Sequence, residues 1–452
     1  MNKLKTFLQS NIYITSVFVL AFIAFISTGE YQIYNTIAMS FLLIVFALIL
    51  SFSKNTIYVV PITFALLYSY NTTNPNLGTI SGFNFIYLIV IFVIGGLITH
   101  IIRFRPKPKI GVLTLSFGLF VIAYFIPMIY RPFTWTLFQL SAVSIIYLLI
   151  YVLLGSTIKP NKDFMMKTIF AASLLLVAEM GFQIGQGFFE FSKEIPVLER
   201  FSQGMRTSWG KGDYGWGNIN DVVIHVVLLM GAQIYHLITY KKHLIFWFFP
   251  LLTVFIVFLS ASRGGYISMS ISFIIYGFLV FKHADRRTWI NFSITLFISV
   301  ILIILMFPVI IEAYELAIQG GFDNLDQFSS SRLTLYRHAI DLFKKYPLFG
   351  IGWEGMIDIG NPDRIQVFHS TIFHTLAVMG LFGFGILIYY FFISFKFLFT
   401  NRTLPKTLIG IGILVSQIHG LYDNTQFMLI YTLSTIVLFT MLEPLEKKAN
   451  LI

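Results

Sequence analysis

The chain has 452 residues, of which 57% are hydrophobic and 11% are charged, and its mean hydropathy is +0.81. This composition excludes a soluble globular domain and predicts an all-α, polytopic membrane protein. The net charge of +11 does not indicate nucleic-acid binding, because the basic residues are scattered among short connections between apolar runs. Cysteine is absent, which excludes disulfide bonds, thiolate nucleophiles and thiolate metal sites.

Apolar runs follow one another from residue 11 onward. A helix needs about 20 apolar residues to cross the hydrocarbon core, and by this criterion we expect about 14 transmembrane helices. Their centres lie near residues 19, 43, 63, 92, 120, 145, 175, 229, 252, 273, 300, 388, 413 and 433. Because the first run is followed by others of similar length, we interpret it as a span and not as a cleaved signal sequence. Residues 1–452 are expected to form a single integral membrane domain.

Lysine and arginine are concentrated in alternate connections between these runs. The positive-inside rule places those connections, and both termini, on the cytoplasmic side of the cytoplasmic membrane. Two long connections, 188–217 and 312–367, are then external. Connections of this length are usually functional or disordered.

The external connection 312–367 is predicted to contain an amphipathic helix within "SSSRLTLYRHAIDLFKKYPLFGIGW". Serines near Ser330 are suitable for capping its start. Its end is indicated by Pro347, Gly350 and Gly352. We therefore expect an external helix followed by a tight glycine turn.

Polar residues inside spans gather in the halves predicted to be external. Ionisable groups near the bilayer centre cost at least about 2.5 kcal/mol each, so those that persist usually face a cavity. Three helix faces have the spacing of a polar stripe: Glu179, Gln183 and Gln186; Asn218, Asp221 and His225; and Ser416, His419 and Asp423. We expect a polar chamber that opens to the external face.

These polar groups also have structural interpretations. Asp221 and His225 could satisfy each other between helices, and His419 and Asp423 could lie in the headgroup layer. The aromatic residues of "SWGKGDYGWGN" could stack on sugars, but interfacial aromatic belts use the same residues.

Two arginines occupy positions at which a positively charged side chain is unexpected. Arg263 precedes two glycines in "SASRGG", and glycine allows a backbone to approach a ligand closely. Arg332 falls in the first turn of the predicted external helix, where the macrodipole disfavours a cation unless an anion is bound there. The two arginines predict a phosphate site; the alternative is that both reach lipid headgroups.

The segment "VFHSTIFHTLAVMGLFGFG" is predicted to begin an apolar helix with His369 at its external end. A histidine can be neutral near physiological pH and accept a proton from a hydroxyl. His374 lies five residues further, roughly 140° around the helix, and cannot share that face. His369 could equally be a packing or capping group.

In this order and topology, "SASRGG", "SRLTLYRHAIDLFKKYPLFGIG" and "HSTIFHTLAVMGLFGFG" resemble the O-antigen ligase and O-antigen polymerase superfamily of bacterial envelope glycosyltransferases. The resemblance is strongest over residues 260–385 and general in hydropathy elsewhere. Members commonly have asparagine after the histidine, where this chain has Ser370.

The resemblance implies a glycosyltransferase that acts on glycans linked through pyrophosphate to undecaprenol, without a metal or cofactor. Arg263 and Arg332 would hold the departing pyrophosphate, and His369 would orient or deprotonate the acceptor hydroxyl. The further candidates for substrate binding are Arg206, Arg200, Glu179, Asp221, His225 and Arg337. A chain-length regulator and a flippase are the candidate protein partners.

Three functions are compatible with these features. The first is a polymerase that joins lipid-linked repeat units into a surface polysaccharide such as a capsule, because two long external connections could accommodate two similar glycans. The alternative is a ligase that transfers the glycan to a lipid core, a protein or a wall polymer. A lipid-linked oligosaccharide flippase is the third, but a flippase needs a polar route to both leaflets.

Overall fold

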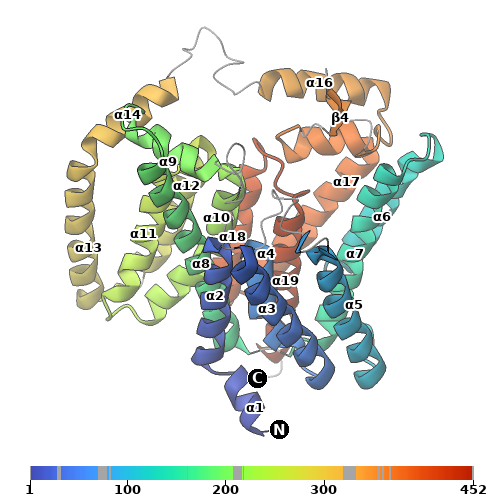
Figure 1. The fold of residues 1–452 in the computed structure, drawn as a ribbon, viewed down its shortest axis with the longest axis horizontal. Helices are drawn as coiled ribbons and strands as arrows, with labels where there is room; N and C mark the ends of the chain where they lie inside the picture. The colour runs from blue at the N-terminus through green and yellow to red at the C-terminus, as the bar shows by residue number, and fades with distance from the viewer. Residues whose placement is uncertain are drawn as a thin grey trace. The chain divides into compact units, whose positions relative to one another are not determined.

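A computed structural model describes most of the chain: residues 2–27, 32–69, 79–80, 83–159, 161–206, 216, 218–282, 284–318, 332–353, 357–358, 361–365 and 368–449. Among these residues, seven helices are long and apolar enough to cross a membrane. Helices dominate the ribbon in Figure 1, and the described strands form two short antiparallel pairs. The predicted class, an all-α polytopic membrane protein, is confirmed.

The chain folds into two compact units. The first comprises Met1–Pro106, Thr157–Leu316 and Ile411–Val415. Its elements are α1 (Asn2–Leu8), α2 (Asn11–Ile26), α3 (Gln32–Phe52), a 3-10 helix (Thr56–Val59), α4 (Val60–Ser69), β1 (Thr79–Ile80), β2 (Phe83–Asn84), α5 (Phe85–Phe104), α8 (Lys162–Glu190), α9 (Val197–Arg206), α10 (Ile219–Thr239), α11 (Ile245–Leu259), α12 (Arg263–Phe281), α13 (Arg286–Leu305) and α14 (Phe307–Ile318).

The second unit comprises Lys107–Ser156, Ala317–Gly410 and Ser416–Ile452. Its elements are α6 (Thr114–Phe125), a 3-10 helix (Ile126–Ile129), α7 (Trp135–Thr157), α16 (Arg332–Lys345), β3 (Ile357–Asp358), β4 (Asn361–Ile365), α17 (Thr371–Phe399), α18 (Leu404–His419) and α19 (Leu429–Ala449).

Every predicted span centre falls within a helix: α2 to α8, α10 to α13, or α17 to α19. Seven of these helices meet the length and composition of a membrane span. Others are shorter, such as α4 with 10 residues and α11 with 15. The number of 14 transmembrane helices therefore stays a prediction, as do the single domain and the external placement of 188–217 and 312–367.

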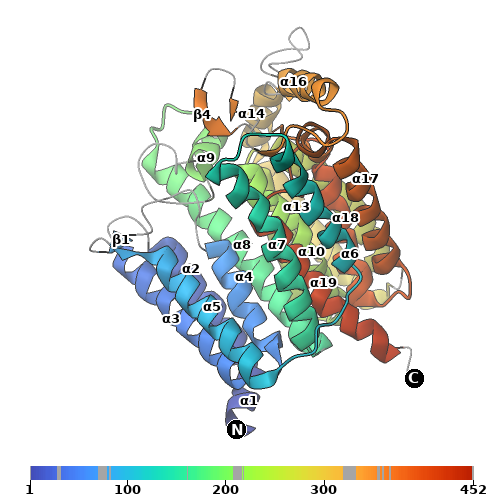
Figure 2. The same ribbon diagram turned by 90° about the vertical axis from the view of Figure 1, so that its right-hand side faces the viewer.

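Helix α10 forms the centre of the first unit, where all residues from Val222 to Leu237 are buried. Its Gln233 donates to Ser173 of α8 at 2.9 Å and accepts from Thr253 of α11 at 2.9 Å, so the buried amide is satisfied by both neighbours. Elsewhere in this unit, α3 packs against α2 and α5, and the three run side by side in Figure 2.

Helix α9 packs backbone to backbone against the end of α8. A Cβ atom on Gly187 would lie 2.3 Å from the carbonyl oxygen of Arg200, so no larger residue fits without a shift. The first turn of α9 is capped from α14: the carboxylate of Glu312 accepts the N–H groups of Leu198 at 2.6 Å and Glu199 at 3.2 Å. One carboxylate thereby satisfies two free helix-end donors.

In the second unit, residues 347–352 interrupt α17 and replace two of the backbone hydrogen bonds of that helix. In a continuous α-helix, the carbonyls of Ala377 and Val378 would accept from the N–H groups of Leu381 and Phe382. These four groups pair instead with residues 347–352, through backbone hydrogen bonds of 2.9 Å and 3.0 Å. The break therefore leaves none of the four unpaired, as an apolar environment requires.

Glycine makes this insertion possible on both sides. Gly380 interrupts α17 with a φ of +61°, and Gly350 has a φ of +71°. A Cβ atom on Gly350 would lie 2.2 Å from a backbone carbon of Val378, and one on Gly380 would lie 2.5 Å from the carbonyl carbon of Leu348. The two backbones approach more closely than any side chain permits.

The predicted amphipathic helix is confirmed as α16, which lies across one end of α17 (Figure 1). Tyr336 stacks on Phe373 of α17 with ring centroids 4.4 Å apart, and Ala339 is buried, whereas Arg337 is exposed. The helix ends at Lys345, ahead of the predicted proline and glycines. The serines expected to cap its start lie outside the described residues.

Gly380→Ala is expected to destabilise the protein. A residue with a Cβ atom pays about 1–2 kcal/mol at positive φ, and the clash with Leu348 adds to this. The matched control is Gly385→Ala in the same helix, where a Cβ meets nothing within 4 Å. There, alanine should be neutral or stabilising by up to about 1 kcal/mol. Thermal unfolding in nanodiscs compares the two; equal melting temperatures would contradict the role of the break.

Candidate active site

His369 lies two residues before α17 and has an unusual backbone. Its φ of +40° is uncommon for a residue other than glycine. Two contacts hold the residue: the Tyr336 hydroxyl donates to the His369 carbonyl at 2.9 Å, and the His369 Nδ1 lies 3.1 Å from Oδ1 of Asp423. The side chain keeps 35% exposure, so the imidazole is held but accessible.

Asp423 joins the two predicted catalytic residues of this unit. Its carboxylate is 5% exposed; Oδ1 faces His369, and Oδ2 lies 3.5 Å from an Arg332 nitrogen. Oδ1 also accepts the N–H of Asn424 at 2.8 Å. Burial by itself would raise the pKa of Asp423, but the hydrogen bond from His369 and the charges of His369 and Arg332 hold that pKa below its ordinary value. The result is a buried anion between two basic groups.

Arg332 reaches this carboxylate because α16 is anchored on α17. It is the first residue of α16, and Tyr336, one turn later, provides both the stacking contact with Phe373 and the hydrogen bond to His369. Burial raises the pKa of the Tyr336 hydroxyl, so it remains a neutral donor. The Arg332 side chain is 22% exposed, which leaves part of the guanidinium accessible.

His374 lies apart from His369, as the helical spacing predicts. It is fully buried among the rings of Trp353, Phe427 and Phe368, with centroids 4.8, 5.0 and 6.2 Å away. Within the described part of the chain, neither of its ring nitrogens has a hydrogen-bond partner. The buried Ser370 hydroxyl likewise has no described partner.

Arg263 belongs to the first unit, where it is the exposed first residue of α12. Ser262 caps the helix by accepting from the Gly265 N–H at 2.9 Å and donates to Asn220 at 2.8 Å. A Cβ atom on Gly265 would lie 2.8 Å from the Val223 side chain. This glycine therefore allows α12 to approach α10, and ligand access is not needed to explain it.

Glu179 is fully buried in α8, and both of its carboxylate oxygens are engaged. The Ser69 hydroxyl donates to one at 2.9 Å and the Trp216 indole to the other at 3.1 Å. His225 packs near Trp216 with ring centroids 5.5 Å apart, and its Nδ1 lies 2.6 Å from the backbone oxygen of Asp221. The predicted polar faces of α8 and α10 thus meet at Trp216.

The neighbouring cations have different surroundings. The Arg200 guanidinium donates to the Phe188 carbonyl at 3.2 Å and lies 4.8 Å from the centre of the Phe188 ring, so it fastens α9 to the end of α8. Arg206 ends α9, and its side chain lies outside the described residues, as do Trp209 and Tyr214. Asp221 accepts from the Asn218 amide at 2.8 Å.

The structure brings Arg332 and His369 together through Asp423, whereas Arg263, Arg200, Glu179, Asp221 and His225 belong to the first unit. Sequence reasoning placed Asp423 on a polar stripe but assigned it no catalytic part, and it did not select Tyr336. The stripe was the available signal for Asp423. Its partner His369 lies 54 positions away along the chain, and no periodicity links residues at that distance.

Residues 248–388 match the family model of the O-antigen ligase domain. No curated protein matches the chain. The matched segment runs from α11 into α17 and contains Arg263, Arg332 and His369, while Asp423 lies beyond it. The similarity of residues 248–388 to this domain supports the resemblance to the O-antigen ligase and polymerase superfamily that the motifs predicted.

Proposed function

We propose that the protein polymerises undecaprenyl-pyrophosphate-linked oligosaccharide repeat units into a surface polysaccharide at the outer face of the cytoplasmic membrane. The O-antigen ligase domain supports an enzyme of glycan assembly that uses lipid-linked substrates in a membrane. The observation that carries the proposal is the Arg332, Asp423 and His369 arrangement, which combines a phosphate-binding cation with an oriented base.

His369 is proposed to take the proton of the acceptor hydroxyl. With Nδ1–H donating to Asp423, the neutral imidazole keeps its lone pair on Nε2, which is the nitrogen that can accept a proton. The hydroxyl oxygen forms a bond to the anomeric carbon of the donor sugar as its proton passes to Nε2. The adjacent carboxylate then stabilises the imidazolium that results.

Arg332 is proposed to hold the leaving group. As the sugar is transferred, the bond between its anomeric carbon and the pyrophosphate oxygen breaks, and the electron pair stays on the lipid pyrophosphate. A guanidinium has five N–H donors, so contact with Asp423 leaves others for phosphate. The helix dipole places partial positive charge at the start of α16, which favours an anion at the same place.

The remaining predicted residues are proposed to bind the rest of the substrates. Arg263 would be the second pyrophosphate cation, and arginines supply the positive charge that metal ions provide in other transferases. Arg206, Arg200 and Arg337 would contact glycan or phosphate around it. Glu179, Asp221 and His225 would form polar contacts to sugar, although the Glu179 oxygens are already engaged with Ser69 and Trp216.

The matched domain model is described as an O-antigen ligase, so ligase activity is the second candidate. We favour polymerisation because two long connections could accommodate two similar lipid-linked glycans. Purified protein given a single lipid-linked repeat unit is expected to yield a ladder of longer products, measured by gel electrophoresis and mass spectrometry. Transfer that occurs only after a foreign acceptor is added would establish a ligase, and substrate crossing sealed vesicles at unchanged length would indicate a flippase.

His369→Asn is expected to lower glycan transfer by about 10²-fold to 10⁴-fold, the usual contribution of a general base. Asparagine tolerates positive φ better than alanine, so the backbone at this position is preserved. Initial rates with a lipid-linked repeat unit measure the effect, with His243→Asn, an exposed position, as the control. Transfer at the wild-type rate would assign His369 to packing alone.

Asp423→Asn is expected to reduce turnover by about 10²-fold while the substrate concentration for half-maximal rate changes little. The amide keeps the shape of the carboxylate but cannot stabilise the imidazolium. Asp341→Asn on α16 is the matched control, because its carboxylate forms an exposed ion pair with Lys344. Melting temperatures of both variants separate loss of chemistry from loss of fold. If Asp423→Asn turned over normally, the proposed orientation of His369 would be wrong.

A further inference from the structure

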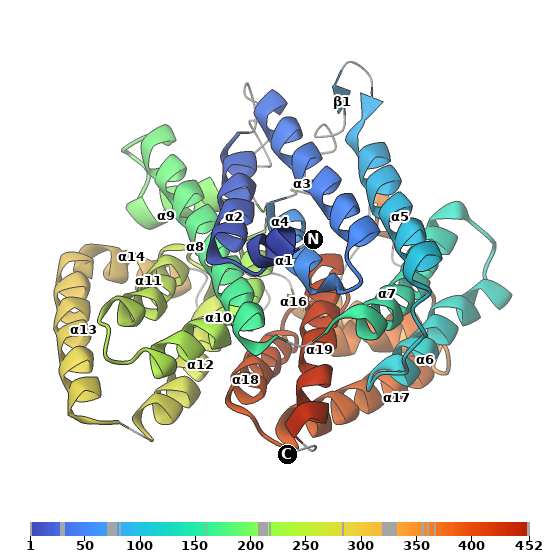
Figure 3. The ribbon, with the colours of Figure 1, turned by 90° about the horizontal axis from the view of Figure 1, so that it is seen from below.

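The segment between α18 and α19, residues 420–428, carries Asp423 and is largely buried although it is not helical. Figure 3 shows the two helices that it joins lying side by side. The side chains from Asp423 to Gln426 are at most 6% exposed. Buried backbone outside a helix must find hydrogen-bond partners on neighbouring elements. The partners of this segment therefore determine where the Asp423 carboxylate lies.

The segment is attached to one residue of α17 on both sides of Asp423. The N–H of Thr371 donates to the carbonyl of Gly420 at 2.8 Å, and the Thr371 hydroxyl accepts the N–H of Gln426 at 3.4 Å. Residues 420–426 thus form a loop that closes on Thr371, with Asp423 at its middle position. Because Thr371 follows His369 by two residues, one threonine relates the carboxylate to the imidazole.

Glycine at position 420 allows this loop to lie close to α17. A Cβ atom on Gly420 would lie 3.0 Å from the Thr371 hydroxyl oxygen and 3.2 Å from the Thr425 hydroxyl oxygen. Both distances are shorter than ordinary van der Waals contacts. A larger residue would push the loop away from the start of α17.

Gln426 fastens the far side of the loop to two further helices. Its side-chain oxygen accepts from the Gln417 amide of α18 at 2.9 Å, and its carbonyl accepts from the Thr432 hydroxyl of α19 at 2.7 Å. With the bond to Thr371, three helices hold this one residue. The loop is therefore rigid on the side of α18 and α19, and Thr371 connects that rigid part to the helix that follows His369.

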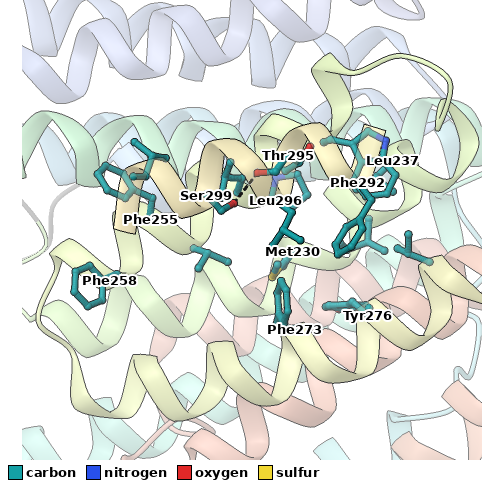
Figure 4. Close-up of a pocket in the computed structure, with 18 of the residues that line it drawn as sticks. Met230, Leu237, Phe255, Phe258, Phe273, Tyr276, Phe292, Thr295, Leu296 and Ser299 are labelled. Atoms are coloured by element: carbon teal, nitrogen blue, oxygen red, sulfur yellow. Dashed lines mark hydrogen bonds between the residues drawn. The ribbon is translucent and has the colours of Figure 1, made fainter. Parts of the chain in front are cut away.

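The hydroxyl of Thr371 is available for this contact because of its place in α17. A serine or threonine inside a helix commonly donates to the carbonyl four residues earlier. Figure 4 shows such a bond from Ser299 of α13, and Thr375 donates to the Thr371 carbonyl in the same way at 2.6 Å. Thr371 is the first residue of α17, so no helical carbonyl lies four residues before it. Its hydroxyl is instead used between segments.

We infer that Thr371 is a positioning residue, which keeps the loop of Asp423 in register with His369. The inference rests on the proposed function, which assigns proton transfer to His369. If the hydroxyl were removed, the Gln426 N–H would be a buried donor without its acceptor, and such a loss costs more than an ordinary hydrogen bond contributes. The loop would shift to satisfy that donor, and Asp423 would move with it.

Two substitutions at Thr371 separate hydrogen bonding from packing. Valine keeps the shape of threonine without the hydroxyl, whereas serine keeps the hydroxyl without the methyl group. Thr371→Val is expected to lower the maximal rate of glycan transfer by about tenfold to 10²-fold, the effect of a misplaced catalytic group, with little change in the substrate concentration for half-maximal rate. Thr371→Ser should recover most of that rate. The opposite order would make Thr371 a packing residue and overturn the inference.

Two controls accompany these rates. Thr375→Val removes a hydroxyl whose described bond lies within α17, so it should transfer glycan as the wild type does. In an Asp423→Asn background, Thr371→Val should cause no further loss, because Thr371 is inferred to act through Asp423. An undiminished effect of Thr371→Val in that background would contradict the inference.

Hydrogen–deuterium exchange in nanodiscs measures the loop without substrate or turnover. Peptides that span residues 420–428 should exchange roughly fivefold faster in Thr371→Val, as expected when one hydrogen bond that opposes local opening is lost. Thr371→Ser and Thr375→Val should exchange as the wild type does. Unchanged exchange in Thr371→Val would overturn the inference. Exchange as expected in a wild-type protein that transfers no glycan would overturn only the proposed function.

Discussion

The arrangement of the second unit depends on the exchange of backbone hydrogen bonds between α17 and residues 347–352. A helix in an apolar environment cannot lose two hydrogen bonds unless another donor and acceptor pair replaces each of them. Since the replacing segment follows α16 after a single residue, its insertion fixes α16 against α17. Arg332 and Tyr336 are thereby held next to His369, which precedes the break by eleven positions. The arrangement of Arg332, Tyr336 and His369 is therefore a consequence of backbone pairing.

Asp423 completes the arrangement from a third direction, after the end of α18. A buried carboxylate with one basic partner would orient that partner alone. Asp423 contacts His369 through one oxygen and Arg332 through the other, so it fixes the positions of these two side chains relative to each other. The contact with Arg332, at 3.5 Å, is longer than an ideal charged hydrogen bond. The imidazole is therefore the more firmly held of the two, as befits a group whose proposed task depends on direction.

Hydropathy and stop signals predicted the fourteen apolar helices and α16, because their information is local, whereas α1, α9 and α14 were not predicted. The fourteen apolar runs are helical, and α16 ends at Lys345, two residues before Pro347. The break at Gly380 was not predicted, since it lies within a continuous apolar run and depends on a segment about thirty residues earlier. The engagement of Glu179 by Ser69, 110 positions away, shows the same limit. Periodicity identifies a polar face but not the group that meets it.

Gly265 is explained by helix packing, whereas the sequence suggested that it allows a ligand to approach. Two glycines beside an arginine favoured close approach to a phosphate, yet a Cβ atom at Gly265 would meet Val223 of α10. Packing between helices accounts for that glycine, so the case for a phosphate at Arg263 depends on the charge and exposure of the arginine itself.

The hydrogen bonds from the first turn of α9 to the Glu312 carboxylate connect the two long connections of the chain. This carboxylate stands at the start of one long connection and holds amides that belong to the other. Replacing either connection alone with that of a related chain would leave the Glu312 carboxylate, or the N–H groups of Leu198 and Glu199, without this hydrogen-bond partner. An exchange of loops with a related chain is therefore expected to keep this contact only when both connections are exchanged together.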